Sequence, residues 1–172
     1  MTFRTAQASD APILAAISIE VWIGTYLRQG VGAVFAEFAL REFTTDRMAA
    51  MIADPSNHVI VSENTEGLDG FMRIGTSRTA PVAGCSTVEI VTLYVQPRHH
   101  GRGIGRALLD RGLAWAGAGG ASSVWLTTNT QNAPAIAFYL SRGFRRIGRT
   151  DFWIDGEAYP NDVFSRDLGS AV

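Results

Sequence analysis

The segment that decides the fold is Val95–Leu109, which reads VQPRHHGRGIGRALL. It joins a run of strand-forming residues to an amphipathic helix through a turn with glycine at every second position from Gly101 to Gly105. Glycine lets the backbone adopt dihedrals that other residues resist, and it lets a bulky anion approach closely. The N-terminus of the following helix presents unpaired N–H groups and a partial positive charge. The segment therefore predicts a phosphate or pyrophosphate site at a strand-to-helix turn.

The residues of the turn narrow the kind of phosphate site. A P-loop requires Lys followed by Ser or Thr after its final glycine, and this chain has Arg106 and Ala107 there. The dinucleotide-binding pattern GxGxxG is also absent, because the chain reads GxGxG. Arg98, Arg102 and Arg106 add local positive charge. From these residues alone, a glycine-rich turn without any ligand stays open as the alternative.

Outward from the turn, the hydrophobic periodicity predicts alternating helices and strands. Apolar residues at helical spacing follow the N-cap residues Ser9-Asp10, and the pattern over 33–53 contains a second N-cap signal at Thr44-Thr45-Asp46. Asp155-Gly156 indicates a tight turn between the last two strands. The expected helices are 11–27, 33–53, 103–118 and 133–141. The expected strands are 3–6, 58–62, 70–75, 87–95, 124–128, 145–154 and 162–168.

This order, β-α-α-β-β-β-α-β-α-β-β, predicts a mixed α/β fold with about seven strands and about four helices. The strand–helix–strand step from 87–95 to 124–128 should place those two strands parallel to each other. The sequence contains no linker, no internal repeat and no low-complexity tract. We therefore expect a single domain over residues 1–172.

Composition and charge exclude several classes of function. The 172 residues are 47% hydrophobic and 18% charged, which is typical of a globular domain and not of a disordered segment. Fifteen basic and sixteen acidic residues give a net charge of −1, so the chain as a whole is not drawn to nucleic acid or to an anionic membrane. The sequence has no signal pattern, no membrane-spanning stretch and no disulfide partner for Cys85, so we expect a cytoplasmic location.

A second informative segment is Asn132–Phe144, which reads NAPAIAFYLSRGF. On a helix, Asn132, Ile136 and Tyr139 fall near one face, because residues three and four apart are neighbours. Pro134 is acceptable there because it lies in the first turn. By itself, the pattern favours a core position for Tyr139 with its hydroxyl bonded inside the protein.

Together, the two segments resemble motifs A and B of the GNAT superfamily of N-acetyltransferases. Motif A has the core Gln/Arg-x-x-Gly-x-Gly/Ala after a strand and a Val-x-Pro, and this chain reads HGRGIG over 100–105 with Val95-Gln96-Pro97 before it. His100 departs from the usual Gln or Arg. Motif B, Asn-x-x-Ala-x-x-Phe-Tyr-x-x-x-Gly-Phe, is matched at every fixed position. The resemblance implies a GNAT-type mixed sheet, acetyl-CoA as the acetyl donor and coenzyme A as a product.

The resemblance also implies roles for particular residues. The amides of the turn would hold the CoA pyrophosphate, and an N–H group, that of Val95, would polarise the thioester carbonyl in the manner of an oxyanion hole. Tyr139 is similar to the general acid of the family, and its ordinary pKa of about 10 keeps it protonated at neutral pH. Asn132 would position the cofactor or the helix. The implied cofactor-binding residues are Leu93, Tyr94, Val95, His100, Gly101, Arg102, Gly103, Ile104, Gly105, Arg106 and Asn132.

Glu89 is the candidate general base. Side chains alternate along a strand, so Glu89 shares one face with Leu93 and Val95. An acid in such an apolar run is unusual and favours a raised pKa. Its position matches the glutamate that part of the family uses as the base. Other roles stay open, because Glu89 can equally be an exposed carboxylate or a cation-binding group, and many relatives deprotonate the amine through water.

The amine acceptor is less well defined. A narrower resemblance, to PaiA-like polyamine N-acetyltransferases, rests on features such as Trp125-Leu126 and the Gly148-x-x-x-Phe152 spacing. Acidic side chains would suit a cationic acceptor and aromatic rings would hold an ammonium by cation–π contact, but surface charge and core packing explain both equally well. The acidic candidates are Glu20, Glu37, Glu42, Asp151, Asp155, Glu157 and Asp162. The aromatic candidates are Trp22, Tyr26, Trp153 and Tyr159.

Three hypotheses follow for the function. The first is acetylation of a small primary amine such as a polyamine. The second is acetylation of a protein amine, an amino acid or an antibiotic. The third is a non-catalytic sensor that binds acyl-CoA, against which Tyr139 argues, because a sensor needs no proton donor. A homodimer is common for such folds, and no nucleic acid, membrane or metal is expected as a partner.

Overall fold

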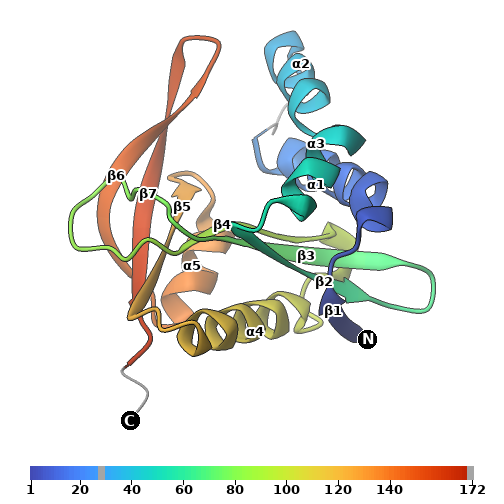
Figure 1. Ribbon diagram of the computed structural model, residues 1–172. Helices are drawn as coiled ribbons and strands as arrows, with labels where there is room; N and C mark the ends of the chain where they lie inside the picture. The colour runs from blue at the N-terminus through green and yellow to red at the C-terminus, as the bar shows by residue number, and fades with distance from the viewer. Residues whose placement is uncertain (27–29, 170–172) are drawn as a thin grey trace. The chain divides into compact units, whose positions relative to one another are not determined.

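The computed structural model describes residues 1–26 and 30–169. Its strands form a seven-stranded mixed sheet in the order β1-β2-β3-β4-β5-β7-β6 (Figure 1). The strands are β1 (Thr2–Thr5), β2 (Asn57–Glu63), β3 (Leu68–Gly75), β4 (Glu89–Val95), β5 (Ser123–Asn129), β6 (Arg145–Ile154) and β7 (Glu157–Asp167). The helices are α1 (Ala11–Tyr26), α2 (Ala33–Glu42), α3 (Thr45–Ala53), α4 (Ile104–Ala118) and α5 (Ala133–Ser141), with short 3-10 helices η1 (Ala8–Asp10) and η2 (Pro97–His99). The predicted mixed α/β fold is confirmed.

The described residues contain five α-helices, where the sequence predicted about four. The predicted helical region 33–53 is two helices, because the chain turns out of the helical conformation between Glu42 and Thr45. Thr44 has an extended backbone, and its side chain accepts a hydrogen bond from the Arg47 N–H at 3.3 Å. This N-cap starts α3 as a separate helix, as the Thr44-Thr45-Asp46 signal indicated.

Strand β7 begins five residues earlier than the predicted strand 162–168, so that prediction was wrong at its first residue. Asp155 and Gly156 have φ values of 47° and 85°, which close a two-residue turn between β6 and β7. Pro160 weakens the strand pattern in the sequence before residue 162, because proline has no N–H to donate. It is tolerated because the ladder with β5 begins only at the next residue, Asn161. The result is the long hairpin that Figure 1 draws in orange and red.

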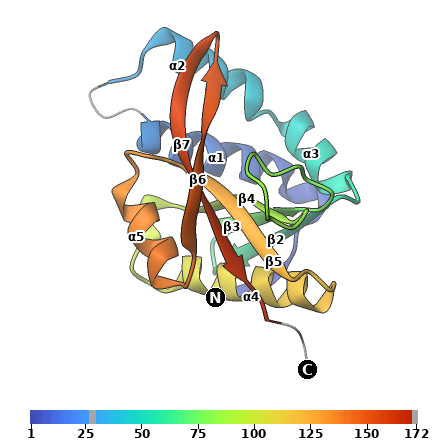
Figure 2. The ribbon, with the colours of Figure 1, turned by 90° about the vertical axis from the view of Figure 1, so that its left-hand side faces the viewer.

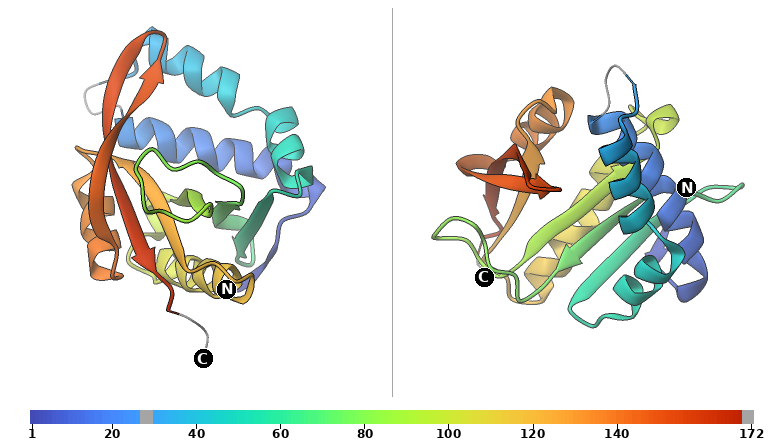
Figure 3. Two further views of the ribbon diagram at one scale, coloured as in Figure 1. Left: turned by 60° about the vertical axis from the view of Figure 1, so that its left-hand side comes forward. Right: turned by 90° about the horizontal axis from the view of Figure 1, so that it is seen from above.

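The chain divides into two compact units, and each is described by itself. The first contains residues 1–74 and 92–112, and the second contains residues 75–91 and 113–169 of the described chain. In the first unit, α1 packs with α2 and α3, drawn in blue to cyan in Figure 3. The buried core of this unit includes Leu14, Ile17, Met48, Val61 and Phe71.

In the second unit, α5 lies alongside β7, as Figure 2 shows. The ring of Tyr139 on α5 contacts the ring of Phe164 on β7, with centroids 6.4 Å apart. Val124, Leu126 and Val163 are fully buried in the adjoining strands. Within residues 1–26 and 30–169, no helix is both long enough and apolar enough to cross a membrane.

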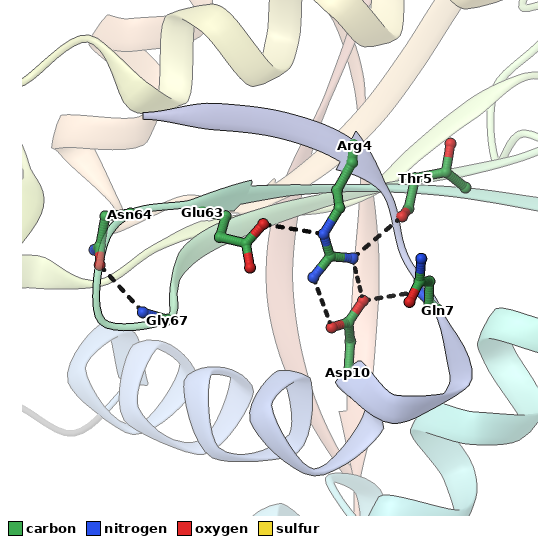
Figure 4. Close-up of polar contacts among 7 residues, drawn as sticks. All are labelled: Arg4, Thr5, Gln7, Asp10, Glu63, Asn64 and Gly67. Atoms are coloured by element: carbon green, nitrogen blue, oxygen red, sulfur yellow. Dashed lines mark hydrogen bonds and ion pairs between the residues drawn. The ribbon is translucent and has the colours of Figure 1, made fainter.

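A partly buried ion pair fixes the start of the chain in the first unit (Figure 4). Two nitrogens of the Arg4 guanidinium donate to the two carboxylate oxygens of Asp10, at 2.7 and 2.9 Å. Asp10 is only 4% exposed and also accepts from the Gln7 N–H, while Arg4 Nε donates to Glu63 at 3.1 Å. The hydrogen bonds from Arg4 lower the pKa of Asp10 and outweigh the opposing effect of burial.

We expect Asp10→Ala to lower the free energy of unfolding by about 2 to 3 kcal/mol at pH 7, because hydrogen bonds to charged groups contribute about 1.5 to 3 kcal/mol. The folded pKa of Asp10 is depressed, so its contribution is complete above the unfolded pKa of about 3.9 and is lost as the pH falls through the folded value. Urea denaturation of both proteins between pH 7 and pH 3 measures this, and the difference between them should shrink with acid.

Glu63→Gln is the matched control for this prediction. The Glu63 side chain is 40% exposed, and exposed ion pairs contribute at most about 1 kcal/mol. A loss of stability as large as that of Asp10→Ala would contradict the assignment of the stabilisation to the Arg4–Asp10 pair. So would a difference between wild type and Asp10→Ala that persists unchanged at pH 3.

Candidate functional site

In the first unit, β4 ends at Val95 and the chain reaches α4 through η2 and the glycine turn. Gly101 and Gly103 have φ values of 76° and 82°. This left-handed conformation is unfavourable for residues with a Cβ atom. A Cβ atom added at either glycine would meet no protein atom within 4 Å. Both glycines are therefore required by backbone conformation, and the face they present is open to a ligand.

The N-terminus of α4 follows the turn directly. Its first backbone hydrogen bond runs from the Ala107 N–H to the Gly103 carbonyl at 2.9 Å. The N–H groups of Ile104, Gly105 and Arg106 precede this bond and have no acceptor within the helix. Together with the helix dipole, these groups form the kind of site that binds phosphate oxygens. Gly105 itself lies inside α4, so its role differs from that of the two glycines before it.

Glu20 of α1 binds two residues at the start of the turn, Gln96 and Arg98. Its carboxylate accepts a hydrogen bond from Gln96 Nε2 at 2.7 Å and one from the Arg98 guanidinium at 3.3 Å. The bond from Gln96, followed by that from Arg98, lowers the pKa of Glu20 against the effect of burial. Part of the positive charge that the sequence placed at the turn is thus neutralised by the protein. Sequence reasoning missed this contact because the partners lie 76 and 78 positions apart.

The other arginines of the turn are mostly exposed. Arg106 lies 3.5 Å from Asp110 on the next turn of α4, and its side chain is 65% exposed. Arg102 has a guanidinium nitrogen 3.4 Å from His99 Nδ1. A cavity of about 600 Å³ adjoins this side of the turn and is lined by the β2–β3 connection and by residues that include Arg98, His99 and Arg102. Ile104, the first residue of α4, also lines this cavity, whereas Gly101 and Gly103 do not.

Near the end of β4, the backbone groups of Leu93 and Val95 have no strand partner on one edge among the described residues. The Gln96 N–H donates to the Asp69 carbonyl of β3 at 3.0 Å. Backbone groups alternate between the two edges of a strand, so the N–H and C=O groups of Leu93 and Val95 lie on the edge away from β3. The Val95 carbonyl accepts a hydrogen bond from His100 Nε2 at 2.9 Å. The Leu93 and Val95 N–H groups are the donors that this edge presents.

Strands β4 and β5 are parallel, as predicted, but their described ladder is short. Glu89 opposite Trp125 is its single register pair, and the Trp125 N–H donates to the Val88 carbonyl at 3.1 Å. Val88 and Gln96 are an even number of positions apart, yet Val88 bonds toward β5 and Gln96 toward β3. A regular strand would bond toward the same side at both, so the chain between Val88 and Gln96 does not alternate regularly. Leu93, Tyr94 and Val95 lie beyond the described β4–β5 register pair.

Glu89 and Tyr139 lie on opposite faces of the sheet within the second unit. Residues directly opposite each other in a ladder share a face, so Glu89 shares the face of Trp125 and of its β7 partner Ser165. Phe164, the next residue of β7, faces the other side and contacts Tyr139. Glu89 is half-buried at the start of β4.

Tyr139 and Asn132 both belong to α5. The Tyr139 residue is 8% exposed, and its ring packs edge-on against Phe144 and Phe138, with centroids 5.5 and 5.4 Å away. Burial raises the pKa of the Tyr139 hydroxyl. Among the described residues, none is found to hydrogen-bond to that hydroxyl, which differs from the internally bonded core tyrosine that the helix pattern favours. Asn132 is the N-cap, because its side-chain oxygen accepts from the Ala135 N–H at 3.3 Å.

The aromatic candidates for the acceptor site separate into different environments. Trp22 is 4% exposed and stacks on Phe38 with ring centroids 5.0 Å apart, so it is a core residue. Trp153 is 61% exposed on the β6–β7 hairpin. The Tyr159 hydroxyl donates to Glu157 at 3.0 Å. The side chain of Tyr26 lies outside the described part of the chain.

Several acidic candidates are engaged by arginines of the protein. Asp162 is 1% exposed and pairs with Arg146 at 3.0 Å and with Arg149 at 3.2 Å. Glu42 accepts from Arg47 at 2.7 Å. Glu20 is bound to Gln96 and Arg98, so these three acidic candidates already have partners in the protein.

A family model described as the acetyltransferase (GNAT) family matches residues 25–144 of this chain. The chain belongs to the GNAT family. An uncharacterised N-acetyltransferase of Mycobacterium tuberculosis is 31% identical over 136 residues, which cover 77% of this chain and 81% of that protein. The streptothricin acetyltransferase of Streptomyces lavendulae is 28% identical over 167 residues, covering 91% of this chain and 87% of that protein.

A solved structure shows the same fold. The PaiA N-acetyltransferase of Thermoplasma acidophilum, crystallised with coenzyme A, matches with a TM-score of 0.76 and 17% identity, over 97% of this chain and 99% of that chain. The family model and the 31% identical relative confirm the predicted GNAT family, its N-acetyltransferase class and, with that class, acetyl-CoA as the co-substrate. The roles of individual residues remain predictions.

Proposed function

We propose that this GNAT protein transfers an acetyl group from acetyl-CoA to a primary amine of a small molecule, with a polyamine-like amine as the first candidate. The observation that carries the proposal is the strand–turn–helix geometry in the first unit. Gly101 and Gly103 have positive φ and an open face, and the amides of Ile104–Arg106 have no helical acceptor. These features fit a bound pyrophosphate, the group that links the two ends of coenzyme A.

The residues of this chain supply three functions in the proposed reaction. The Leu93 and Val95 N–H groups, on the free edge of β4, are donors for the thioester carbonyl oxygen. Glu89, which lies on the face of the sheet opposite Tyr139, accepts a proton from the ammonium, so that the neutral nitrogen can form the new C–N bond. Tyr139 donates a proton to the sulfur as the C–S bond breaks, and the second proton that the nitrogen loses on becoming an amide restores the tyrosine hydroxyl. Bound acetyl-CoA supplies the activated acyl group.

The support for Tyr139 is its burial and its protonation. Burial in the ring cluster raises the pKa of its hydroxyl, so it retains its proton at neutral pH. An acid that must wait for a departing thiolate needs this property. No described residue competes for the hydroxyl, which leaves it available to a ligand.

A second candidate is acetylation of an amine on an antibiotic. The similarity to the streptothricin acetyltransferase extends over 91% of this chain and favours this candidate. The ion pairs at Glu20, Glu42 and Asp162 also lower the negative charge available to bind a polycation. An acceptor of lower charge does not depend on those carboxylates.

The experiment that tests the proposal measures thiol release from acetyl-CoA across a panel of amines. The panel contains spermidine, a streptothricin, amino acids and a peptide with a free N-terminus. We expect one class of small amine to raise release above background hydrolysis, with the acetylated amine identified by mass spectrometry. If the protein binds CoA but no amine raises thiol release, the sensor hypothesis replaces the enzyme.

We expect Glu89→Gln to lower kcat/KM for the amine about tenfold at pH 7, a moderate effect for a base that water can partly replace. The carboxylate must be ionised to accept a proton, so its loss should also remove the acidic limb of the pH–rate profile. Glu66→Gln, in the exposed β2–β3 turn, is the control that removes one carboxylate elsewhere. An unchanged rate and acidic limb in Glu89→Gln would favour deprotonation through water.

A further inference from the structure

His100 is the one residue of the turn that departs from the family pattern, and the structure gives it a specific contact. Its ring nitrogen Nε2 lies 2.9 Å from the carbonyl oxygen of Val95. A carbonyl oxygen can only accept, so Nε2 must carry the hydrogen in this contact. The bond therefore runs from the residue just before Gly101 back to the last residue of β4.

The segment between these two residues is already ordered by its own backbone. The His99 N–H donates to the Gln96 carbonyl at 2.9 Å, and the His100 N–H donates to the Pro97 carbonyl at 3.1 Å. These two hydrogen bonds form the short helix η2. The bond from the imidazole closes this segment onto the strand. It thereby fixes where the glycine turn begins relative to the end of β4.

The Val95 carbonyl is on the same free edge as the Val95 N–H, because both groups of one residue point to the same side of a strand. With the carbonyl held by His100, the orientation of Val95 on that edge is fixed. In the proposed function, the edge binds the part of acetyl-CoA near the thioester and the turn binds the pyrophosphate. One cofactor molecule must make both contacts at the same time. Its affinity therefore depends on the distance and orientation between the edge of β4 and the turn.

We propose that His100 is a positioning residue for acetyl-CoA, which acts by donating its Nε2 hydrogen to the Val95 carbonyl and so fixing the strand edge against the turn. This inference rests on the proposed function. The usual Gln or Arg at this position also carries N–H donors on a long side chain. The departure to His therefore changes the residue type but keeps the donor.

The test compares His100→Ala with His100→Gln. His100→Ala raises the KM for acetyl-CoA and the Kd of coenzyme A about fivefold, the effect of one lost hydrogen bond, and leaves kcat within about twofold. His100→Gln retains an N–H donor and restores both constants to near the wild-type values. The melting temperatures of both variants stay close to that of wild type, because the bond is exposed.

A second measurement needs no variant. Long-range proton–nitrogen NMR of the wild-type imidazole, at a pH where the ring is neutral, reports which nitrogen carries the hydrogen, and we expect Nε2. Three results would overturn the role of His100: the Nδ1–H tautomer, wild-type coenzyme A affinity in His100→Ala, or a His100→Gln as weak as His100→Ala. Failure of the wild-type protein to bind coenzyme A would instead overturn the proposed function.

Discussion

Replacing Tyr139 with phenylalanine is expected to lower kcat about 10²-fold and to leave coenzyme A affinity nearly unchanged, as for the loss of a general acid. The substitution removes only the hydroxyl, so the packing of the ring against Phe144 and Phe164 is retained. Steady-state kinetics with saturating amine gives kcat, and isothermal titration with coenzyme A gives the affinity. Without its donor, the thiolate must leave unprotonated or take a proton from water.

Phe144→Leu is the matched control for the ring packing. Phe144 is 2% exposed and touches Tyr139 edge-on, so this variant should lose stability yet keep kcat within severalfold. The pH dependence offers a further check, because burial raises the pKa of Tyr139 above its ordinary value of about 10. The wild-type rate should therefore not fall between pH 8 and 10 through loss of this proton. Near-normal turnover of Tyr139→Phe would remove the residue from the proposed role.

Local patterns in the sequence were sufficient to predict most of the fold. The change from a strand pattern to glycines and then to helical spacing placed the turn after Val95, and the structure begins α4 at Ile104. Thr44 predicted the break between α2 and α3 because an N-cap depends on one side chain and a backbone amide three residues away. The first residues of β7 were missed, because Pro160 weakens a strand pattern unless its neighbouring strand is known to end there.

The sequence predicted the parts of the candidate site whose conformation depends only on neighbouring residues. The conformation of Gly101 and Gly103 follows from the turn itself, and the structure has the positive φ values that the glycines allow. The brace from Glu20 to Gln96 and Arg98 depends on where α1 packs, which no local pattern encodes. The same is true of Trp22, which pattern reasoning could assign either to an acceptor site or to the core, and which is stacked on Phe38.

Gly103→Val should raise the Kd of coenzyme A about 10²-fold, the largest binding effect expected in this protein. Valine at a φ of 82° is strained, so the turn must shift, and its side chain would occupy the open face where no protein atom lies within 4 Å. Losing one or two charge-assisted hydrogen bonds to phosphate, at about 1.5 to 3 kcal/mol each, corresponds to this factor. Isothermal titration with coenzyme A measures the change.

Gly120→Val is the control that separates the effect of backbone strain from the loss of contacts with coenzyme A. Gly120 follows the other end of α4 with a φ of 83° and also has no atom within 4 Å of an added Cβ, so both variants introduce the same side chain in the same backbone conformation. Both should lose stability in thermal unfolding, because a β-branched residue is disfavoured there. Only Gly103→Val should lose coenzyme A affinity, since only that position faces the proposed pyrophosphate. Equal affinities in the two variants would show that the open face of the turn does not bind the cofactor.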